Sequence, residues 1–121
     1  MIHLRSKQVI YIRKHVVWFG SSSFNDISLE QFHFCSHVTD RHACLYFDEK
    51  SHRFELLNYS EYGVGVDEFA YGLIESKCSS NEQCFCSNQI VNQWDGPALI
   101  DQGTVIHIGC HEFLFYRHIV R

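Results

Sequence analysis

Residues 42–57 read HACLYFDEKSHRFELL, which is two mainly apolar runs separated by a short polar stretch. In the first run Ala43, Leu45 and Phe47 are spaced two apart, which is the side-chain period of a β-strand with one buried face. The polar residues between the runs are typical of a hairpin turn, and residues 53–57 form the expected return strand. The stretch therefore predicts an antiparallel β-hairpin.

Similar short runs of β-branched and aromatic residues recur on both sides of this hairpin. They are residues 9–12, 16–19, 26–29, 98–100, 104–108 and 112–116, with one or two more short strands expected within residues 66–74. No segment of about ten residues or more has the 3.6-residue period of an amphipathic helix. Many short strands separated by turn residues predict an all-β sandwich or barrel.

The composition favours one domain over residues 1–121, because 45% of the 121 residues are hydrophobic and can form one packed core. Residues 75–95 are polar and cysteine-bearing, and we expect them to be an insertion before the last strands. The net charge of -4 disfavours non-specific nucleic-acid binding, so no nucleic-acid partner is expected. No apolar run approaches about 18 residues, and the first residues do not form a signal peptide, so no membrane partner is expected.

Five motifs occur in an order and spacing that resemble the forkhead-associated (FHA) domain. They are Gly20, residues 26–29 (DISL), residues 39–43 (TDRHA), residues 60–64 (SEYGV) and residues 100–109 (IDQGTVIHIG). The resemblance covers roughly residues 9–117 apart from the insertion. It implies an FHA-like sandwich of two antiparallel sheets.

The resemblance also implies a peptide-binding site, at the end of the sandwich where loops 20–23, 39–42 and 62–65 are expected to meet. FHA domains grip an extended phosphothreonine peptide there, and a phosphate of charge about -2 needs rigidly held, charge-assisted donors. The peptide-binding residues implied are Gly20, Ser21, Ser22, Thr39, Arg41, Tyr62 and Gly63. His42 matches the family's structural histidine, which ties the recognition loop to its neighbours. We interpret Gly20 and Gly63 as positions of positive φ.

Several positions depart from the residues that hold phosphate in this family. Ser21 stands where the family has arginine, Tyr62 stands where it has asparagine, and Asp40 adds a negative charge beside the expected phosphate. Losing the arginine alone removes charge-assisted bonds worth roughly 1.5–3 kcal/mol, which is about one to two decades in affinity. We therefore predict a protein-interaction module that acts independently of phosphate, and ordinary phosphothreonine binding is the alternative. Thr39 either contacts a ligand or caps its own loop.

Six cysteines in a chain without an export signal indicate a reducing compartment. The candidate zinc ligands are Cys35, Cys78, Cys84 and Cys86, with His37 as a substitute for Cys35. Four such ligands would hold a structural zinc and staple the insertion to the sandwich. Free thiols on a loop are the other interpretation. Cys44 and Cys110 fall in or beside strands and are expected to be small buried side chains.

A closer likeness involves residues 42–49 (HACLYFDE) and 55–61 (ELLNYSE), which look like the FHA domains of PHD finger proteins. Those proteins are chromatin readers of Sin3 histone deacetylase corepressor complexes. The likeness implies a nuclear protein, and a protein or peptide partner such as a subunit of that complex. The chain has no nucleophile elbow, phosphate-binding Gly-Lys loop or His-Glu-x-x-His motif, so no enzyme is expected.

Overall fold

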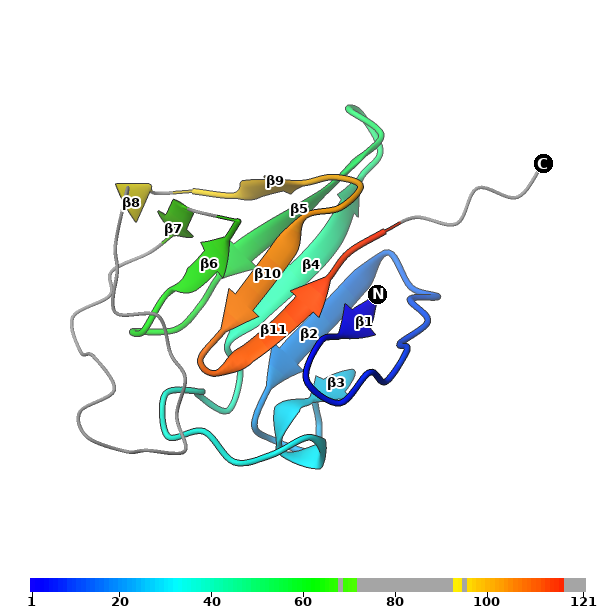
Figure 1. Ribbon diagram of the computed structural model, residues 1–121. Coiled ribbons are helices and arrows are strands. Elements are labelled where there is room, and N and C mark those ends of the chain that lie inside the picture. Colours follow the sequence, from blue (N-terminus) through cyan, green and yellow to red (C-terminus); the bar gives the residue numbers. More distant parts are fainter. Residues whose placement is uncertain (68, 72–92, 95, 117–121) are drawn as a thin grey trace.

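The computed structural model of the chain describes residues 1–67, 69–71, 93–94 and 96–116, which form two β-sheets. The five-stranded sheet has the order β3 (Ile27–Ser28), β2 (Val16–Gly20), β4 (Ala43–Asp48), β5 (Arg53–Asn58) and β9 (Ala98–Ile100). The six-stranded sheet has the order β1 (Ile2–His3), β11 (His111–Leu114), β10 (Val105–Ile108), β6 (Val64–Val66), β7 (Phe69–Tyr71) and β8 (Gln93–Trp94). A three-residue 3-10 helix, η1 (Leu29–Gln31), follows β3 (Figure 1).

The hairpin predicted from residues 42–57 is confirmed as the centre of the five-stranded sheet. Strands β4 and β5 pair antiparallel from Ala43 with Asn58 to Asp48 with Arg53. Ala43 and Leu45 are buried in the core and Phe47, at the end of the same face, is half-buried. The alternation in the sequence therefore marks the inner face of the strand correctly.

The six-stranded sheet contains the predicted closing hairpin, in which β10 and β11 pair antiparallel from Val105 with Leu114 to Ile108 with His111. Strand β6 pairs antiparallel with β10 and with β7. The expectation of one or two short strands within residues 66–74 is confirmed by β7, whereas β6 begins two residues earlier. Two pairs are parallel instead, β2 with β3 and β7 with β8. In both, a two-residue strand lies at the edge of its sheet, so the antiparallel prediction holds for the longer strands.

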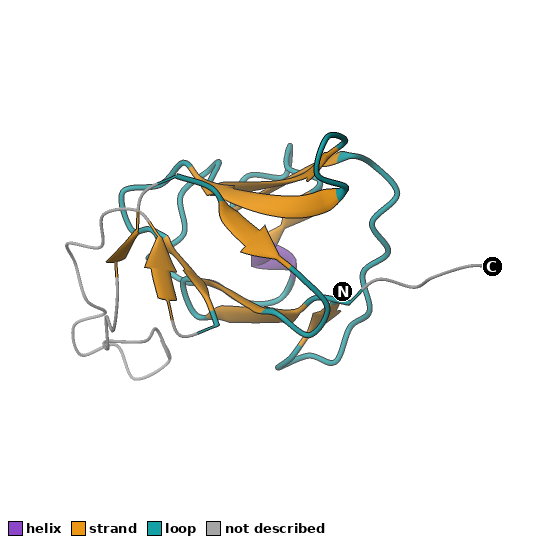
Figure 2. Ribbon diagram, turned by 90° about the horizontal axis from the view of Figure 1, so that it is seen from above, coloured by secondary structure: helices purple, strands orange, loops and turns teal. Residues whose placement is uncertain are grey.

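The core lies between the two layers of strands, which face each other in Figure 2. Phe19 of β2 and Phe113 of β11 are both fully buried and meet edge-to-face across the layers, with their ring centroids 5.6 Å apart. Aromatic pairs in this geometry contribute about 0.5–1.5 kcal/mol beyond the burial of their surface. The two sheets are thus joined by apolar packing and the prediction of an all-β sandwich is confirmed.

The strand expected at residues 9–12 is wrong. Only Val9 forms an isolated bridge, to Ile2, and Ile10 exchanges hydrogen bonds with Met1 through its backbone. The edge of β11 is occupied by β1 instead, so residues 10–12 have no sheet partner among the described residues. Their apolar pattern reflects packing, because Ile10 and Ile12 lie against the core while Tyr11 is exposed.

Most of the predicted insertion, residues 75–92 and 95, lies outside the described residues. Its described end, β8, continues the six-stranded sheet beside β7. Among the described residues, no helix is both long and apolar enough to cross a membrane.

Candidate functional site

Three loops from distant parts of the chain meet at one end of the sandwich. We call them the loop rim, which consists of residues 20–25, 39–42 and 60–65. The strand registers require this meeting, because Phe19 near the end of β2 pairs with Ala43 at the start of β4, and Ala43 pairs with Asn58 at the end of β5. Figure 1 shows the connections that follow β2 and precede β4 at the same, lower end. The structure thus brings together the loops that the sequence placed in one site.

His42 ties the three loops of the rim together. It is fully buried; its backbone N–H donates to the Phe19 carbonyl (2.8 Å), and its Nδ1 accepts from the Thr39 N–H (3.2 Å). Its Nε2 lies 2.8 Å from the Gly63 carbonyl oxygen and 2.9 Å from Ser60 Oγ. Because Nδ1 accepts, the partners assign the ring proton to Nε2, which donates toward Gly63 and Ser60.

The environment of His42 keeps its ring neutral. Burial lowers the pKa of His42 from 6.5 to about 4, and the hydrogen bond to the Gly63 carbonyl opposes this shift only in part. A buried imidazole with such a pKa carries no charge at neutral pH. Both ring nitrogens are engaged by the protein, so these contacts support the structural role expected for His42.

Glycine is needed at two rim positions for different reasons. At Gly63 the backbone has a φ of 77°, as the sequence predicted. Gly20 is not among the residues of positive φ, so that interpretation is wrong there. A Cβ at Gly20 would instead overlap the carbonyl oxygen of Asp40 and lie 2.6 Å from Asn25 Nδ2. The close approach of the second loop, rather than a left-handed conformation, explains glycine at this position.

The first loop is fastened to the second by hydrogen bonds that involve Asp40. The Ser21 N–H donates to the Thr39 carbonyl (3.0 Å), and the Ser22 N–H points at the Asp40 carbonyl (3.4 Å). The Ser21 hydroxyl donates to Asp40 Oδ1 (3.1 Å). A carboxylate therefore lies beside the position at which the FHA resemblance implies an arginine.

The other two polar residues of the second loop are also engaged by the protein. Thr39 Oγ1 donates to the Arg41 carbonyl (3.1 Å), so this hydroxyl caps its own loop. The Arg41 guanidinium lies over the ring of Trp18, 4.5 Å from its centroid. Trp18 alternates in β2 with the buried Val17 and Phe19, so it faces outward from the five-stranded sheet. Arg41 is thus held on the outer face of that sheet by a cation–π contact.

Tyr62 packs against a neighbouring loop. Its half-buried ring meets His37 edge-on, with the ring centroids 5.0 Å apart. This contact orders the third loop against residues that precede the second. The packing interpretation of Tyr62 is therefore observed, and whether its exposed part also meets a ligand stays a prediction.

The charge of the loop rim does not suit an anion. Its ionised side chains are Asp40, Glu61 and Arg41, which sum to one net negative charge (1 − 2). Arg41, the one cation of the rim, stacks on the Trp18 ring, and the Ser21 hydroxyl donates its hydrogen bond to the Asp40 carboxylate. The rim can offer backbone groups, hydroxyls and aromatic edges to a peptide, but no charge-assisted pair of donors of the kind that holds phosphate.

Reasoning from sequence missed three residues of this region. Asn25 joins the first two loops, since its Nδ2 donates to the carbonyls of Asp40 (2.6 Å) and Ser22 (2.8 Å). An asparagine in a serine-rich turn is the available signal for this role. Phe24 on the same loop is 94% exposed, and Trp18 supports Arg41. Nothing local in the sequence identifies those two as surface aromatics.

The cysteine pattern is only partly described by the structure. Cys35 is buried, and its Sγ lies 3.1 Å from Sγ of Cys110, which the sequence analysis treated only as a small buried side chain. Cys44 is buried as predicted and lies on β4. The other three candidate zinc ligands, Cys78, Cys84 and Cys86, lie outside the described residues. The proposed zinc therefore stays a prediction, with Cys110 as a further thiol beside Cys35.

Comparisons with known proteins bear on the fold. No protein-family model matches the chain. Mycobacterium tuberculosis EmbR in complex with a low-affinity phosphopeptide is similar with a TM-score of 0.65 and 19% identity, over 95% of this chain and 23% of the EmbR chain. A structure from a study of phosphothreonine-dependent FHA domain interactions has a TM-score of 0.61 and 17% identity, over 96% of this chain and 91% of that one.

A third similar structure is the N-terminal FHA domain of S. cerevisiae Rad53 in complex with a phosphothreonine peptide. Its TM-score is 0.50 at 19% identity, over 88% of this chain and 69% of that one. This chain thus spans about a quarter of EmbR but most of the isolated FHA domains that it matches. At these identities the likeness concerns the fold: the described part of the chain has the two-sheet β-sandwich fold of the FHA domain.

Proposed function

We propose that this chain is a non-enzymatic, FHA-type protein-interaction module that binds its partner at the loop rim without requiring phosphothreonine. The FHA fold supports peptide or protein binding, since the EmbR and Rad53 structures hold phosphopeptides. One observation separates this chain from phosphate-dependent recognition. The Ser21 hydroxyl is bonded to the Asp40 carboxylate, so a negative charge lies beside the place where the resemblance implies a phosphate-binding arginine.

The magnitudes favour recognition independent of phosphate. Charge-assisted hydrogen bonds contribute roughly 1.5–3 kcal/mol. Without the arginine, the affinity of the rim for phosphate is therefore lower by about one to two orders of magnitude. Arg41 does not replace it, because the guanidinium is stacked on Trp18 at 4.5 Å. A phosphate would also have to approach Asp40, whose like charge opposes it.

The proposed context is a nuclear corepressor. The likeness of residues 42–49 and 55–61 to the FHA domain of PHD finger protein 12 supports a chromatin protein of the Sin3 histone deacetylase type. On this proposal the partner is a subunit of that complex, the module acts in the nucleus, and neither nucleic acid nor membrane is its ligand. The exposed Phe24 on the rim, together with neutral hydroxyls, suits a partly apolar peptide.

The test compares phosphorylated and unphosphorylated versions of the same peptides from purified Sin3-type corepressor subunits, titrated by calorimetry. The wild-type chain should bind both forms with dissociation constants within about threefold. The double variant Ser21→Arg with Tyr62→Asn restores the two missing donors and should prefer the phosphorylated form by roughly ten- to a hundredfold.

The matched control is Ser51→Arg with Tyr11→Asn, which makes the same chemical changes at exposed positions away from the rim. It should leave the preference unchanged. A wild-type chain that binds phosphothreonine peptides at least tenfold more tightly than their unphosphorylated forms would establish ordinary FHA recognition instead. A double variant that gains no preference would show that the rim residues are aligned incorrectly.

A zinc-stapled structural scaffold is the second candidate, and the approach of Cys35 Sγ to Cys110 Sγ favours it. Thiolates brought together by the fold are typical ligands of structural zinc. Native mass spectrometry should then find zinc that is lost in Cys35→Ser and in Cys110→Ser but retained in Cys44→Ser, which removes an equally buried thiol. Equal zinc content in all three variants would rule out a zinc site at the Cys35–Cys110 pair.

A further inference from the structure

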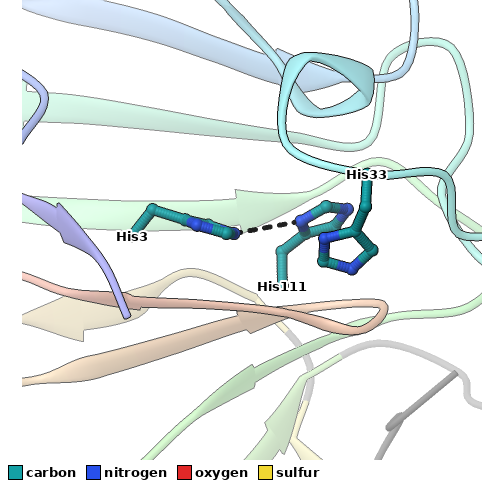
Figure 3. A group of neighbouring side chains, drawn as sticks. All are labelled: His3, His33 and His111. Atoms are coloured by element: carbon teal, nitrogen blue, oxygen red, sulfur yellow. Dashed lines mark hydrogen bonds between the residues drawn. The ribbon is translucent and has the colours of Figure 1, made fainter. Parts of the chain in front are cut away.

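Three histidines from distant parts of the chain gather at the edge of the sandwich opposite β8, close in sequence to the buried Cys35–Cys110 pair but with ring nitrogens instead of thiols as candidate ligands. His3 lies in the edge strand β1, His111 begins β11, and His33 follows η1 (Figure 3). The register explains the first two: His3 is opposite Phe113, and His111 precedes Phe113 by two residues on the same face. Such diagonal neighbours on adjacent strands are within reach of long side chains. We call these three residues the histidine cluster.

The rings of the histidine cluster are close enough to share one ion. The Nε2 atom of His3 lies 3.2 Å from Nδ1 of His111, and the ring of His33 stacks on that of His111 with their centroids 4.1 Å apart. One ligand atom from each ring lies within 4.8 Å of the other two. Two nitrogens bound to one tetrahedral zinc at 2.0–2.1 Å are about 3.3–3.4 Å apart. The 3.2 Å between the first pair, which share a hydrogen bond here, is close to this separation.

The protein leaves part of this cluster unsatisfied. His3 and His111 are each 1% exposed, yet Nε2 of His111 and Nε2 of His33 have no hydrogen-bond partner among the described residues. Buried polar nitrogens are normally paired, because the loss of water is otherwise uncompensated. If the cluster only filled space, phenylalanine would pack there without burying unpaired nitrogens, as Phe32 and Phe113 do beside His3. A metal ion binds ring nitrogens of this kind where one from each of three histidines lies so close to the others.

The rings are also in the right charge state. Burial is the largest cause that lowers the pKa of His3 to about 4, of His111 to about 3 and of His33 below its ordinary value. Arg5 contributes to all three shifts, and Cys35 partly opposes the shift at His33. A neutral ring can present one lone pair to a metal, and at His3 this places the ring proton on Nδ1, where Ser6 Oγ can accept it.

Two further contacts prepare the site. Ser6 Oγ lies 2.7 Å from Nδ1 of His3, which is the kind of outer hydrogen-bond partner that orients metal-bound histidines. Phe32 stacks on His3 with ring centroids 3.9 Å apart and fixes the plane of the ring. His33 is only half-buried, so an ion can enter from its side. Arg5 is the positive group that opposes a cation here, and three imidazole lone pairs must outweigh it.

From this geometry we infer that His3, His33 and His111 form a binding site for a divalent transition-metal ion of the zinc class, with water as the fourth ligand. Three imidazoles suit zinc and its neighbours rather than calcium or magnesium, which take oxygen ligands. The site holds β1 and the segment after η1 against β11, so its effect on the protein is to stabilise this edge of the sandwich. The inference is independent of what the loop rim binds.

The test titrates the metal-stripped chain with Zn²⁺ and, separately, with Co²⁺, whose visible absorption reports its ligands. We expect binding of one ion at the histidine cluster, with a tetrahedral Co²⁺ spectrum that lacks the sulfur-to-cobalt charge-transfer band. At a hundredfold excess of Zn²⁺ over its Kd, the Tm should rise by roughly 11 °C. His33→Gln should weaken binding at least about tenfold, the lower bound known for outer partners of metal ligands.

The controls separate this site from other ligands. His15→Gln removes an exposed histidine outside the cluster, and Cys35→Ser removes the nearest candidate thiol. Both should bind Co²⁺ at the histidine cluster as the wild type does. Because His33 is half-buried, His33→Gln is expected to fold, and its Tm without metal checks this. His111→Gln repeats the measurement at a second ligand.

Either of two results would overturn the inference. One is a wild-type chain that binds neither ion at micromolar concentration. The other is Co²⁺ bound with a thiolate band, lost in Cys35→Ser and retained in His33→Gln and His111→Gln.

Discussion

His42 offers the most direct test of how the loop rim is held together. Replacing the fully buried His42 by alanine removes the hydrogen bonds to Thr39, Gly63 and Ser60. The Thr39 N–H then loses its ring acceptor, and the Gly63 carbonyl keeps only the long contact from Ser60 Oγ (3.4 Å). Three hydrogen bonds at about 1 kcal/mol each, with a residual cavity, amount to a loss of about 3–5 kcal/mol in the free energy of unfolding.

This loss converts to a large change in Tm. A chain of 121 residues has an unfolding entropy of about 0.25 kcal/mol/K. The expected fall in Tm for His42→Ala is therefore about 12–20 °C, measured by circular dichroism at pH 7 and checked by calorimetry. Amide hydrogen exchange should also accelerate at Thr39 and Gly63, because their loops lose a common anchor.

The control is His15→Ala, which removes a histidine whose side chain is 72% exposed. Surface substitutions of this kind change stability by about 0.5 kcal/mol at most, or about 2 °C here. If His42→Ala lowers the Tm by less than about 4 °C, or if exchange at Thr39 and Gly63 is unchanged, His42 does not hold the rim and the reasoning is refuted.

Two more predictions concern the same region. Because burial lowers the pKa of His42 from 6.5 to about 4, the unfolded chain binds a proton that the folded chain does not between these pH values. The contribution of His42 is complete above pH 6.5 and is lost as the pH falls to about 4, by about 3 kcal/mol in all. Urea unfolding at several pH values should show this loss, and His42→Gln should show a shallower pH dependence; equal slopes would contradict the assignment. Gly20→Ala should lower the free energy of unfolding by about 1–3 kcal/mol, because its Cβ meets the Asp40 carbonyl and Asn25 Nδ2. Ser23→Ala, at an exposed position of the same loop, is the control, and similar stabilities of the two variants would show that the loop yields to the extra atom.

Much of the fold could be predicted because the signals are local. The alternation of Ala43, Leu45 and Phe47 marks one face of a strand whatever the rest of the chain does, and the same holds for the closing strands. The loops of the rim were predicted from the resemblance to FHA domains, and the strand registers explain why they meet. Strands that pair antiparallel in register bring their connecting loops to the same ends of the sheet.

The sequence-based predictions fail where residues pack against the core without joining a β-sheet. Ile10 and Ile12 pack against the core with alternating side chains, as in a strand. Their backbone does not pair with β11, because β1 already occupies that edge of the sheet. Gly20 shows the same limit at one residue. Glycine is needed there because a side chain would collide with the Asp40 carbonyl, which is twenty residues away in the sequence. A local sequence pattern does not contain that contact.

From the amino-acid sequence alone come the all-β class and the order of the main strands, since each rests on periodicity within a few residues. The loops expected to form one site came from the resemblance to FHA domains, which rests on the order and spacing of five short motifs. The pairing of Ser21 with Asp40, the stacking of Arg41 on Trp18 and the meeting of His3, His33 and His111 follow only from closure of the sandwich. Those contacts join segments up to 108 residues apart, as for His3 and His111. Their geometry depends on which strands become neighbours and on how the two sheets pack, and no local stretch of the chain carries that information.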